Sequence, residues 1–258
     1  MIEILLIGIG SGNPEHLTLE AIKALRTAEL ILIPVKGADK SDLADVRRQM
    51  VAEFATSPQT RVVEFAMPRR DTGNPDYLAG VEQWHEMVAA AWRTEIVSHA
   101  TGDCRVALLV WGDPSLYDST LRISARLAEQ LPVNVRVIPG ITSLQALTAA
   151  HGIPLNEIGD SVAITTGRQL RDHGWPADID TLAVMLDGEC SFQAVSSVTD
   201  ASIWWGAYLG LPQEMVLSGP LTDTGPKIIA ARSQARARHG WIMDVYILRR
   251  EPLQQRAG

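Results

Sequence analysis

The sequence has few cysteines, and their placement predicts neither a disulfide framework nor a metal site. Cys104 and Cys190 are the only two, and the six histidines lie singly along the 258 residues. A structural zinc site needs several cysteine or histidine ligands at short spacings, and a disulfide-stabilised domain needs several cysteine pairs. We therefore expect a protein without a metal ion.

The sequence also lacks a membrane-spanning run, a secretory leader and an excess of basic residues. Its first apolar run, residues 2–9, is too short to span a bilayer and contains Glu3. No basic stretch precedes this run and no small-residue cleavage site follows it. The formal net charge of −7 argues against nucleic-acid binding, which usually needs a basic face. We expect a cytoplasmic protein with no nucleic-acid or membrane partner.

The apolar residues that are present follow the periods of an α/β protein. They make up 46% of the chain, enough to bury the core of one large or two modest domains. Residues 2–7 form a nearly continuous apolar run, typical of a strand covered on both faces. Residues 18–28 then show helical spacing, and residues 30–35 form a second apolar run. This β–α–β beginning predicts a parallel sheet with right-handed crossovers.

The same patterns continue through two halves of the chain. Further strands are predicted at 61–66, 105–110 and 133–138, and then at 162–166, 181–186, 202–205, 214–217 and 241–248, with less helix in the second half. Gly152, Pro154 and Gly159 mark a boundary between them. We therefore expect two α/β domains, residues 1–155 and 156–258. Ligands of such folds favour the carboxyl ends of strands.

A glycine-rich corner, Gly8-Ile9-Gly10-Ser11-Gly12-Asn13, follows the first strand. The dinucleotide-binding fingerprint needs a third small residue where Asn13 stands, and an acidic residue at the end of the next strand. That strand ends in Pro34-Val35-Lys36. A nicotinamide-binding site therefore has weak support, and a simple tight turn explains the glycines as well as a ligand does. No phosphate-binding Gly-x-x-x-x-Gly-Lys-Ser/Thr sequence occurs.

Two more corners follow predicted strands. One is Trp111-Gly112-Asp113-Pro114, where Asp113 places a carboxylate at the carboxyl edge of the sheet. The other is Pro139-Gly140-Ile141-Thr142-Ser143, whose hydroxyl residues would also serve as a helix cap. Each corner alone is typical of an ordinary turn.

In this order, the corners resemble the tetrapyrrole methylase family of S-adenosylmethionine-dependent methyltransferases. The resemblance covers nearly the whole chain, through residues 8–12, 112–114, 139–143, 152–155, 184–188 and 219–221. Ser11 and Asn13 stand where the general family has proline and aspartate. The sequences of residues 8–18 and 185–188 resemble those of family members that act on precorrin-5 in aerobic cobalamin synthesis.

The resemblance implies two α/β domains, with S-adenosylmethionine in the cleft between them, usually in a homodimer. By position, it implies cofactor contacts at Trp111, Gly112, Asp113, Leu116, Thr142, Ser143, Leu186, Leu209, Gly210 and Pro220. Backbone groups at strand ends would bind adenine and the methionine tail, and Leu116 and Leu186 would form apolar walls.

The implied reaction methylates precorrin-5 at ring carbon C-1 and releases an acetyl group as acetate. Removing the acetyl group requires a directed water and a stabilised oxyanion. Asp113 is the first candidate for this polar chemistry, and His16 is the second, as a base. The structural alternatives are that Asp113 braces its loop and that His16 begins a helix.

A precorrin carries many carboxylates, so an acidic protein must present local cations to it. Arg69 and Arg70, in the predicted loop 67–75, and Arg168 and Arg171 are candidates, with exposed solvated charges as the alternative. Three other functions stay open: a different precorrin C-methyltransferase, a nicotinamide-dependent oxidoreductase, and a scaffold that carries precorrins without turnover.

Overall fold

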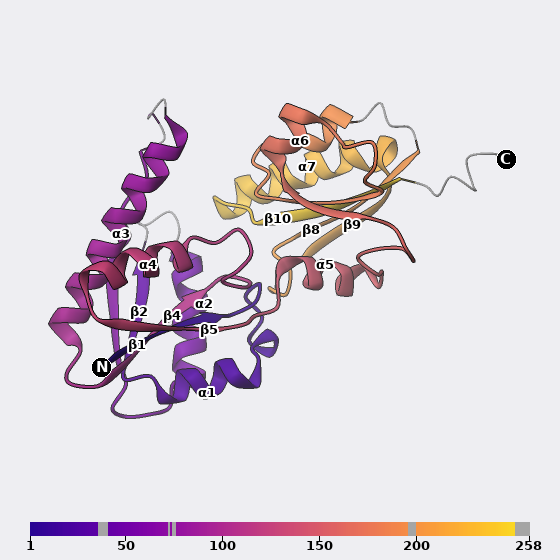
Figure 1. The fold of residues 1–258 in the computed structure, drawn as a ribbon. Coiled ribbons are helices and arrows are strands. Elements are labelled where there is room, and N and C mark those ends of the chain that lie inside the picture. The colour runs from indigo at the N-terminus through magenta and orange to yellow at the C-terminus, as the bar shows by residue number, and fades with distance from the viewer. Residues whose placement is uncertain (36–40, 72, 74–75, 196–199, 251–258) are drawn as a thin grey trace. The chain divides into compact units, whose positions relative to one another are not determined.

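The fold comprises two compact units, each built on its own sheet (Figure 1). The computed structural model describes residues 1–35, 41–71, 73, 76–195 and 200–250. Contacts divide the chain into Met1–Thr142 and Ser143–Gly258. Helix α5 (Ser143–His151) belongs to the second unit because it packs against three strands of that sheet. The expected division at residues 155 and 156 assigned this helix to the first unit.

The first unit contains a five-stranded sheet in the order β3-β2-β4-β1-β5. Its strands are β1 (Ile2–Gly8), β2 (Leu30–Val35), β3 (Arg61–Ala66), β4 (Cys104–Val110) and β5 (Val133–Ile138). Every neighbouring pair is parallel. All five carboxyl ends therefore lie at one edge of the sheet.

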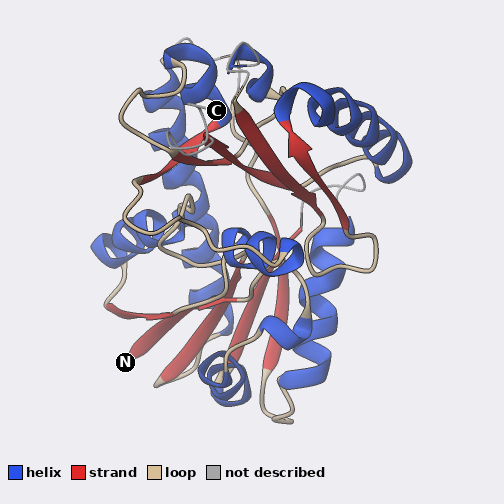
Figure 2. Cartoon of the chain, turned by 90° about the vertical axis from the view of Figure 1, so that its right-hand side faces the viewer, coloured by secondary structure: helices blue, strands red, loops and turns tan. Residues whose placement is uncertain are grey.

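Helices cover both faces of this sheet (Figure 2). They are α1 (Leu19–Thr27), α2 (Ser41–Phe54), α3 (Tyr77–His99) and α4 (Thr120–Gln130), with a short 3-10 turn, η1 (Pro14–His16), before α1. Leu5 and Ile7 of β1 pack into the core under α1 and α2, whereas Ile4 and Leu6 pack into the core under α3 and α4. Successive strand residues point to opposite faces, so a strand covered on both sides is apolar throughout.

The second unit contains a mixed five-stranded sheet in the order β6-β7-β10-β8-β9. Its strands are β6 (Val162–Thr166), β7 (Thr181–Met185), β8 (Ala201–Ala207), β9 (Met215–Pro220) and β10 (Asp244–Arg250). Its helices are α5, α6 (Gly167–His173), the 3-10 turn η3 (Ser191–Val195) and α7 (Leu221–His239). The expected α/β fold with two sheets is confirmed.

The pairing directions decide which ends of these strands share an edge. Strand β10 is antiparallel to both β7 and β8, so β7 and β8 run the same way. Strand β9 runs against β8. One edge of the sheet therefore carries the carboxyl ends of β7 and β8 together with the amino ends of β10 and β9. In the described part of the chain, no helix has both the length and the apolar character needed to cross a bilayer.

Candidate active site

Three glycines let the carboxyl ends of β1, β4 and β5 approach each other closely. A Cβ atom added to Gly140 would lie 2.2 Å from the carbonyl oxygen of Gly112, and one added to Gly8 would lie 2.6 Å from the amide nitrogen of Gly140. Neither distance is compatible with a side chain. Close backbone packing therefore requires glycine at these positions. From the sequence alone, this requirement could not be distinguished from a ligand contact.

The glycine-rich corner after β1 is hydrogen-bonded to the turn after β4. Gly10 and Gly112 form an isolated antiparallel bridge, in which the Gly112 amide donates to the Gly10 carbonyl at 2.8 Å. Gly112 has φ +64°, in the left-handed region that favours glycine. A Cβ atom on Gly112 would lie 3.7 Å from Cα of Thr142. The structure thus brings the predicted residues Gly112 and Thr142 together.

The Asp113 carboxylate joins the same two turns. Its Oδ2 accepts a hydrogen bond from the Gly140 amide at 2.8 Å, and its Oδ1 accepts from the amide of Ser115 at 2.8 Å and from the Ser115 hydroxyl. Partial burial raises the pKa of Asp113, but these hydrogen bonds outweigh it and hold the pKa below its ordinary value. Asp113 therefore braces its loop, and the second lone pair of Oδ2 is left for a water or a ligand.

We expect Asp113→Asn to destabilise the protein by about 2 kcal/mol, because the Asn NH₂ group cannot accept one of these hydrogen bonds. The folded pKa is lowered, so the stabilisation is complete above the unfolded value near pH 4 and is lost as the pH falls through the folded pKa. Urea unfolding at several pH values measures both effects. Asp45→Asn, which alters an exposed ion pair with Arg48, is the matched control and should cost under about 1 kcal/mol. Equal losses in both variants would contradict the bracing role.

His16 lies in the same corner, at the end of η1. Its Cβ lies 2.9 Å from the position that a Cβ on Gly10 would occupy. Its Nδ1 is buried and has no hydrogen-bond partner among the described residues. The amide of His16 donates to the Asn13 carbonyl at 2.9 Å, so His16 ends the 3-10 turn η1, whereas the structural alternative had it begin a helix.

Leu116 and the two loop arginines occupy different parts of this unit. Leu116 stays with the turn, since its amide donates to the Asp113 carbonyl at 3.3 Å. Arg69 and Arg70 follow β3, the edge strand, and both are exposed. The guanidinium of Arg70 lies 5.2 Å from the ring centroid of Tyr77. Among the described residues, no hydrogen bond or ion pair joins either arginine to the Gly112 turn. Residues 72 and 74–75 of the predicted loop lie outside the described part.

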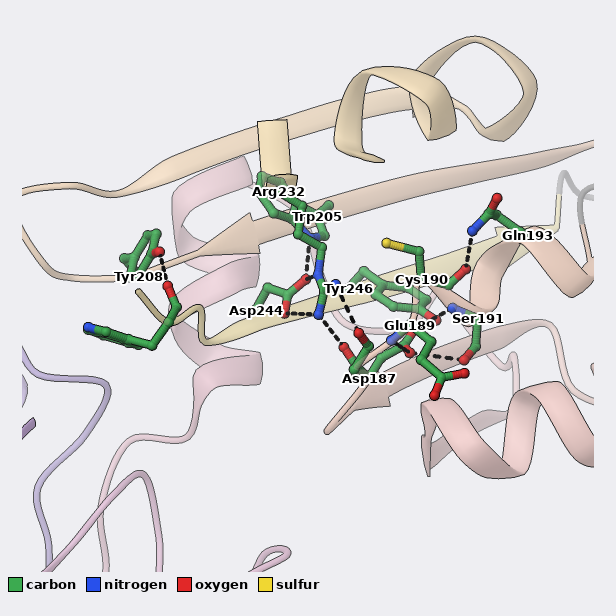
Figure 3. Close-up of polar contacts among 12 residues, drawn as sticks. Asp187, Glu189, Cys190, Ser191, Gln193, Trp205, Tyr208, Arg232, Asp244 and Tyr246 are labelled. Atoms are coloured by element: carbon green, nitrogen blue, oxygen red, sulfur yellow. Dashed lines mark hydrogen bonds and ion pairs between the residues drawn. The ribbon is translucent and has the colours of Figure 1, made fainter. Parts of the chain in front are cut away.

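In the second unit, the end of β7 carries an unusual pair of residues, Leu186 and Asp187. Leu186 has φ +52°, which is strained for a branched side chain, and its side chain is 67% exposed. Asp187 is buried, and its carboxylate accepts hydrogen bonds from the Ser191 amide at 2.6 Å and from the Tyr246 hydroxyl at 2.7 Å (Figure 3). Gly167 leaves room for this carboxylate, since a Cβ there would lie 2.4 Å from its Cγ. The buried carboxylate therefore holds the turn that exposes Leu186.

A buried ion pair contacts this turn through hydrogen bonds to its carbonyl groups. The Nε of Arg232, on α7, lies 2.9 Å from Oδ2 of Asp244, and the two side chains are 10% and 8% exposed. The same guanidinium donates to the carbonyls of Asp187 at 2.7 Å and Gly188 at 3.0 Å. Trp205 donates its indole N–H to Asp244 at 2.8 Å (Figure 3). The sequence analysis missed this cluster, because residues 187, 205, 232 and 244 meet only through the pairing of the sheet.

The remaining predicted residues of the second unit do not all lie at this edge. Leu209 and Gly210 follow β8 and share the edge with Leu186. Pro220 is paired with Ser202, at the beginning of β8, and therefore lies at the opposite edge. The structure separates Pro220 from Leu209 and Gly210, because β9 runs antiparallel to β8.

Residues that were not predicted as contacts also lie at the edge that carries Leu186, Leu209 and Gly210. The segment before β10 lies there, since the Tyr208 amide donates to the Met243 carbonyl at 2.9 Å. Tyr208 itself has φ +53° and is buried. No local sequence signal marks Met243 or Tyr208.

The other candidates lie on helices of the second unit. Ser143 is the first residue of α5. Arg168 and Arg171 lie on α6, and Arg171 forms an exposed ion pair with Glu189 at 2.7 Å. Within the described ranges, no three acidic, histidine or cysteine side chains are grouped so that they could hold a metal ion.

Comparison with known proteins identifies the family. The tetrapyrrole (corrin/porphyrin) methylases match residues 3–224 of the chain. The chain belongs to this family. Precorrin-6A synthase [deacetylating] of Sinorhizobium sp is 48% identical over 252 residues, which cover 97% of this chain and 96% of that protein.

Two solved structures have folds similar to that of this chain. The cobalamin synthesis related protein CobF of Corynebacterium diphtheriae superposes with a TM-score of 0.82 at 41% identity, covering 97% of this chain and 99% of that chain. Uroporphyrin-III C-methyltransferase of Thermus thermophilus, complexed with S-adenyl homocysteine, has a TM-score of 0.57 at 19% identity, covering 95% and 96%. The latter likeness supports the fold alone.

Proposed function

We propose that this methylase converts precorrin-5 to precorrin-6A, by methylating ring carbon C-1 and releasing the acetyl group as acetate. The observation that carries the proposal is the 48% identity to precorrin-6A synthase [deacetylating] over 97% of the chain. The methyl donor would be S-adenosylmethionine, in keeping with the family. The homodimer and the cytoplasmic location stay predictions.

The strand ends described above fit a sulfonium donor of this kind. In the first unit, the proposed contacts are Trp111, Gly112, Asp113, Leu116 and Thr142. In the second unit, they are Ser143, Leu186, Leu209 and Gly210, with Pro220 left out for the reason given above. An exposed apolar side chain such as Leu186, held by a buried brace, suits a flat adenine or ribose face. When bound, S-adenosylmethionine supplies a methyl group that is already strongly electrophilic.

The chain's part in methyl transfer is alignment, which lowers the barrier by several kcal/mol without acid–base chemistry. Loss of the acetyl group needs more from the side chains. Asp113 is ionised at neutral pH, because its pKa is lowered, so it would orient a water or a cation rather than donate a proton. His16 has a buried ring nitrogen without a described partner, so it is the candidate base. Arg69, Arg70, Arg168 and Arg171 stay proposed contacts for substrate carboxylates.

The deciding experiment incubates the protein with precorrin-5 and isotopically labelled S-adenosylmethionine. We expect the pigment to gain one labelled methyl group and one equivalent of acetate to appear. Methyl gain without acetate would instead indicate a different precorrin C-methyltransferase. Precorrin binding without turnover would indicate a scaffold, and saturation by NAD without S-adenosylmethionine binding would indicate an oxidoreductase. Acetate release by Asp113→Asn at the wild-type rate, with normal cofactor binding, would exclude Asp113 from the chemistry.

Leu186→Gly separates strain from cofactor contact at the end of β7. Glycine relieves the positive φ, worth about 1 kcal/mol, but adds unfolded-state entropy of similar size, so stability should change by under about 1 kcal/mol. If the exposed side chain covers the cofactor, its loss removes about 2 kcal/mol of apolar burial, and S-adenosylmethionine should bind about 30-fold more weakly. Calorimetric titration and thermal unfolding measure the two quantities. Unchanged affinity would remove Leu186 from the proposed site.

A further inference from the structure

Four residues other than glycine have a positive φ in the described part of the chain, and all of them lie in segments that follow the carboxyl ends of strands. They are Tyr117 between β4 and α4, Leu186 and Cys190 after β7, and Tyr208 after β8. This backbone is strained for such side chains, and strained residues cluster at functional sites. Cys190 and Tyr208 are buried, whereas Leu186 and Tyr117 are 67% and 43% exposed. Each unit therefore presents one strained, exposed side chain, and the proposed contacts include only Leu186.

The turn that presents Tyr117 is hydrogen-bonded on both sides of it. Asp113 Oδ1 accepts from the Ser115 amide at 2.8 Å, and Asp118 Oδ1 accepts from the Thr120 amide at 2.7 Å. The hydroxyls of Ser115 and Thr120 donate to the same two oxygens. The backbone of Tyr117 is therefore fixed by its neighbours, and glycine or asparagine would adopt it with less strain. A large, exposed ring at such a position favours contact with a ligand.

Arg122, on α4, places an exposed cation beside the same turn. Its Nη1 donates to the carbonyl of Asp118, the residue after Tyr117, at 3.0 Å. Among the described residues it forms no other hydrogen bond and no ion pair, so four of its five N–H donors remain for a ligand. Arg126, one helical turn further along α4, differs, because it forms ion pairs with two glutamates of α3. An exposed aromatic ring and an exposed guanidinium at one turn suit a flat ligand that carries carboxylates.

We propose that Tyr117 and Arg122 bind the tetrapyrrole substrate, with the Tyr117 ring against a face of the macrocycle and the Arg122 guanidinium paired with one of its carboxylate arms. The inference rests on the proposed function, which supplies a substrate of this chemistry. An aromatic ring stacks on a conjugated macrocycle, and a guanidinium fork matches a planar carboxylate. Partial burial raises the pKa of Tyr117, so its hydroxyl stays neutral and does not repel those carboxylates. Neither residue was among the contacts predicted from the sequence.

The first test measures binding of precorrin-5 to the full chain by the absorbance of the pigment. S-adenosylhomocysteine is present throughout, because it cannot transfer a methyl group. Tyr117→Asn should weaken binding at least tenfold, or by about 1.4 kcal/mol, whereas Tyr117→Phe, which keeps the ring, should stay within about threefold of wild type. Equal affinity in wild type and Tyr117→Asn, equal losses in the two variants, or no binding to wild type would each overturn the proposal.

Thermal unfolding shows whether the effect of Tyr117→Asn is confined to the substrate. Asparagine tolerates a positive φ better than tyrosine does, so this variant should unfold at or above the wild-type melting temperature. Its affinity for S-adenosylmethionine should be unchanged. A lower melting temperature with both affinities reduced would indicate a structural role and overturn the proposal. Weaker S-adenosylmethionine binding with unchanged precorrin-5 binding would indicate that the ring contacts the cofactor, and would overturn it as well.

Arg122→Gln tests the carboxylate contact without removing a described ion pair. It should weaken precorrin-5 binding at least fivefold, and the affinity that remains should depend less on salt than that of wild type. Arg126→Gln is the matched control, because it makes the same change on the same helix at a guanidinium that is already paired. Its affinity for precorrin-5 should equal that of wild type. Equal affinities in Arg122→Gln and Arg126→Gln would overturn the proposed contact.

Turnover separates this inference from the proposed function. If wild type binds precorrin-5 through these two residues but neither transfers a labelled methyl group nor releases acetate, the proposed function fails and the inference stands. If wild type converts precorrin-5 with a KM that neither Tyr117→Asn nor Arg122→Gln changes, the proposed function stands and the inference fails.

Discussion

Gly140→Ala should destabilise the protein by about 3 kcal/mol and weaken S-adenosylmethionine binding by at least tenfold. The new Cβ would lie 2.2 Å from the Gly112 carbonyl oxygen and 2.8 Å from the carbonyl carbon of Gly8, so two strand ends must separate. Overpacking of this kind costs about 1–3 kcal/mol where side chains yield, and backbone atoms yield less readily. The separation would also lengthen the hydrogen bond from Gly140 to Asp113, now 2.8 Å.

Thermal unfolding and calorimetric titration measure the two effects. Gly102→Ala is the matched control, because Gly102 has φ +61° but nothing within 4 Å of its added Cβ. That variant should cost only about 1 kcal/mol of left-handed strain and leave cofactor affinity unchanged. If Gly140→Ala lost no more stability and no more cofactor affinity than Gly102→Ala, the close packing of the three turns would not be what stabilises this site.

Arg232→Met should cost about 3–5 kcal/mol, because it leaves Asp244 as an unpaired charge inside the second unit. It also removes donors from the carbonyls of Asp187 and Gly188, which hold the turn beside Leu186. We therefore expect a lower melting temperature and weaker S-adenosylmethionine binding. Arg232→Lys keeps a charge but not the planar fork, so its loss should be intermediate.

Urea unfolding of the full chain measures these losses. The control is Glu189→Gln, which removes an exposed ion pair with Arg171 in the same unit. Exposed pairs contribute under about 1 kcal/mol, so this variant should unfold close to wild type. A cost for Arg232→Met as small as for Glu189→Gln would show that Asp244 is solvated or protonated without its partner.

Three strands of the first unit could be predicted, with their ends, from local sequence alone. Residues 30–35, 61–66 and 133–138 were expected as strands and match β2, β3 and β5 residue for residue. Strands of a parallel sheet are bounded by polar or glycine-rich corners, so both their identity and their ends are visible in the sequence. The corners could also be placed at one edge, since parallel strands share their carboxyl ends.

In the second unit, local sequence patterns did not predict one helix and the position of one candidate residue. Helix α7 was not predicted, and it contains Gly225-Pro226, which in sequence is a strong helix-breaking signal. Burial of its inner face outweighs that signal, and Gly225 lets Phe192 approach to 3.4 Å from where a Cβ would be. Likewise, the expected grouping of Pro220 with Leu209 depends on strand direction, which is a property of pairing and not of either segment.

In the candidate site, too, local motifs predicted the turn residues but not the long-range contacts that support them. The turn residues Gly112, Asp113 and Thr142 could be placed together from motifs at parallel strand ends. The brace from Asp113 to Gly140 spans 27 residues, and the support of Leu186 by Asp187, Tyr246 and Arg232 spans up to 59. Such contacts depend on register and on burial, which composition and spacing do not specify.

The order of the second sheet has a consequence for how the protein is made. Strand β10 is made after the other four strands of its sheet but lies between β7 and β8, so that sheet has no centre until residues 244–250 have been synthesised. The first unit has all five of its strands by residue 138. On the ribosome, the first unit can therefore fold while the second still exposes strand edges, which makes the incomplete second unit the segment that most needs protection from aggregation.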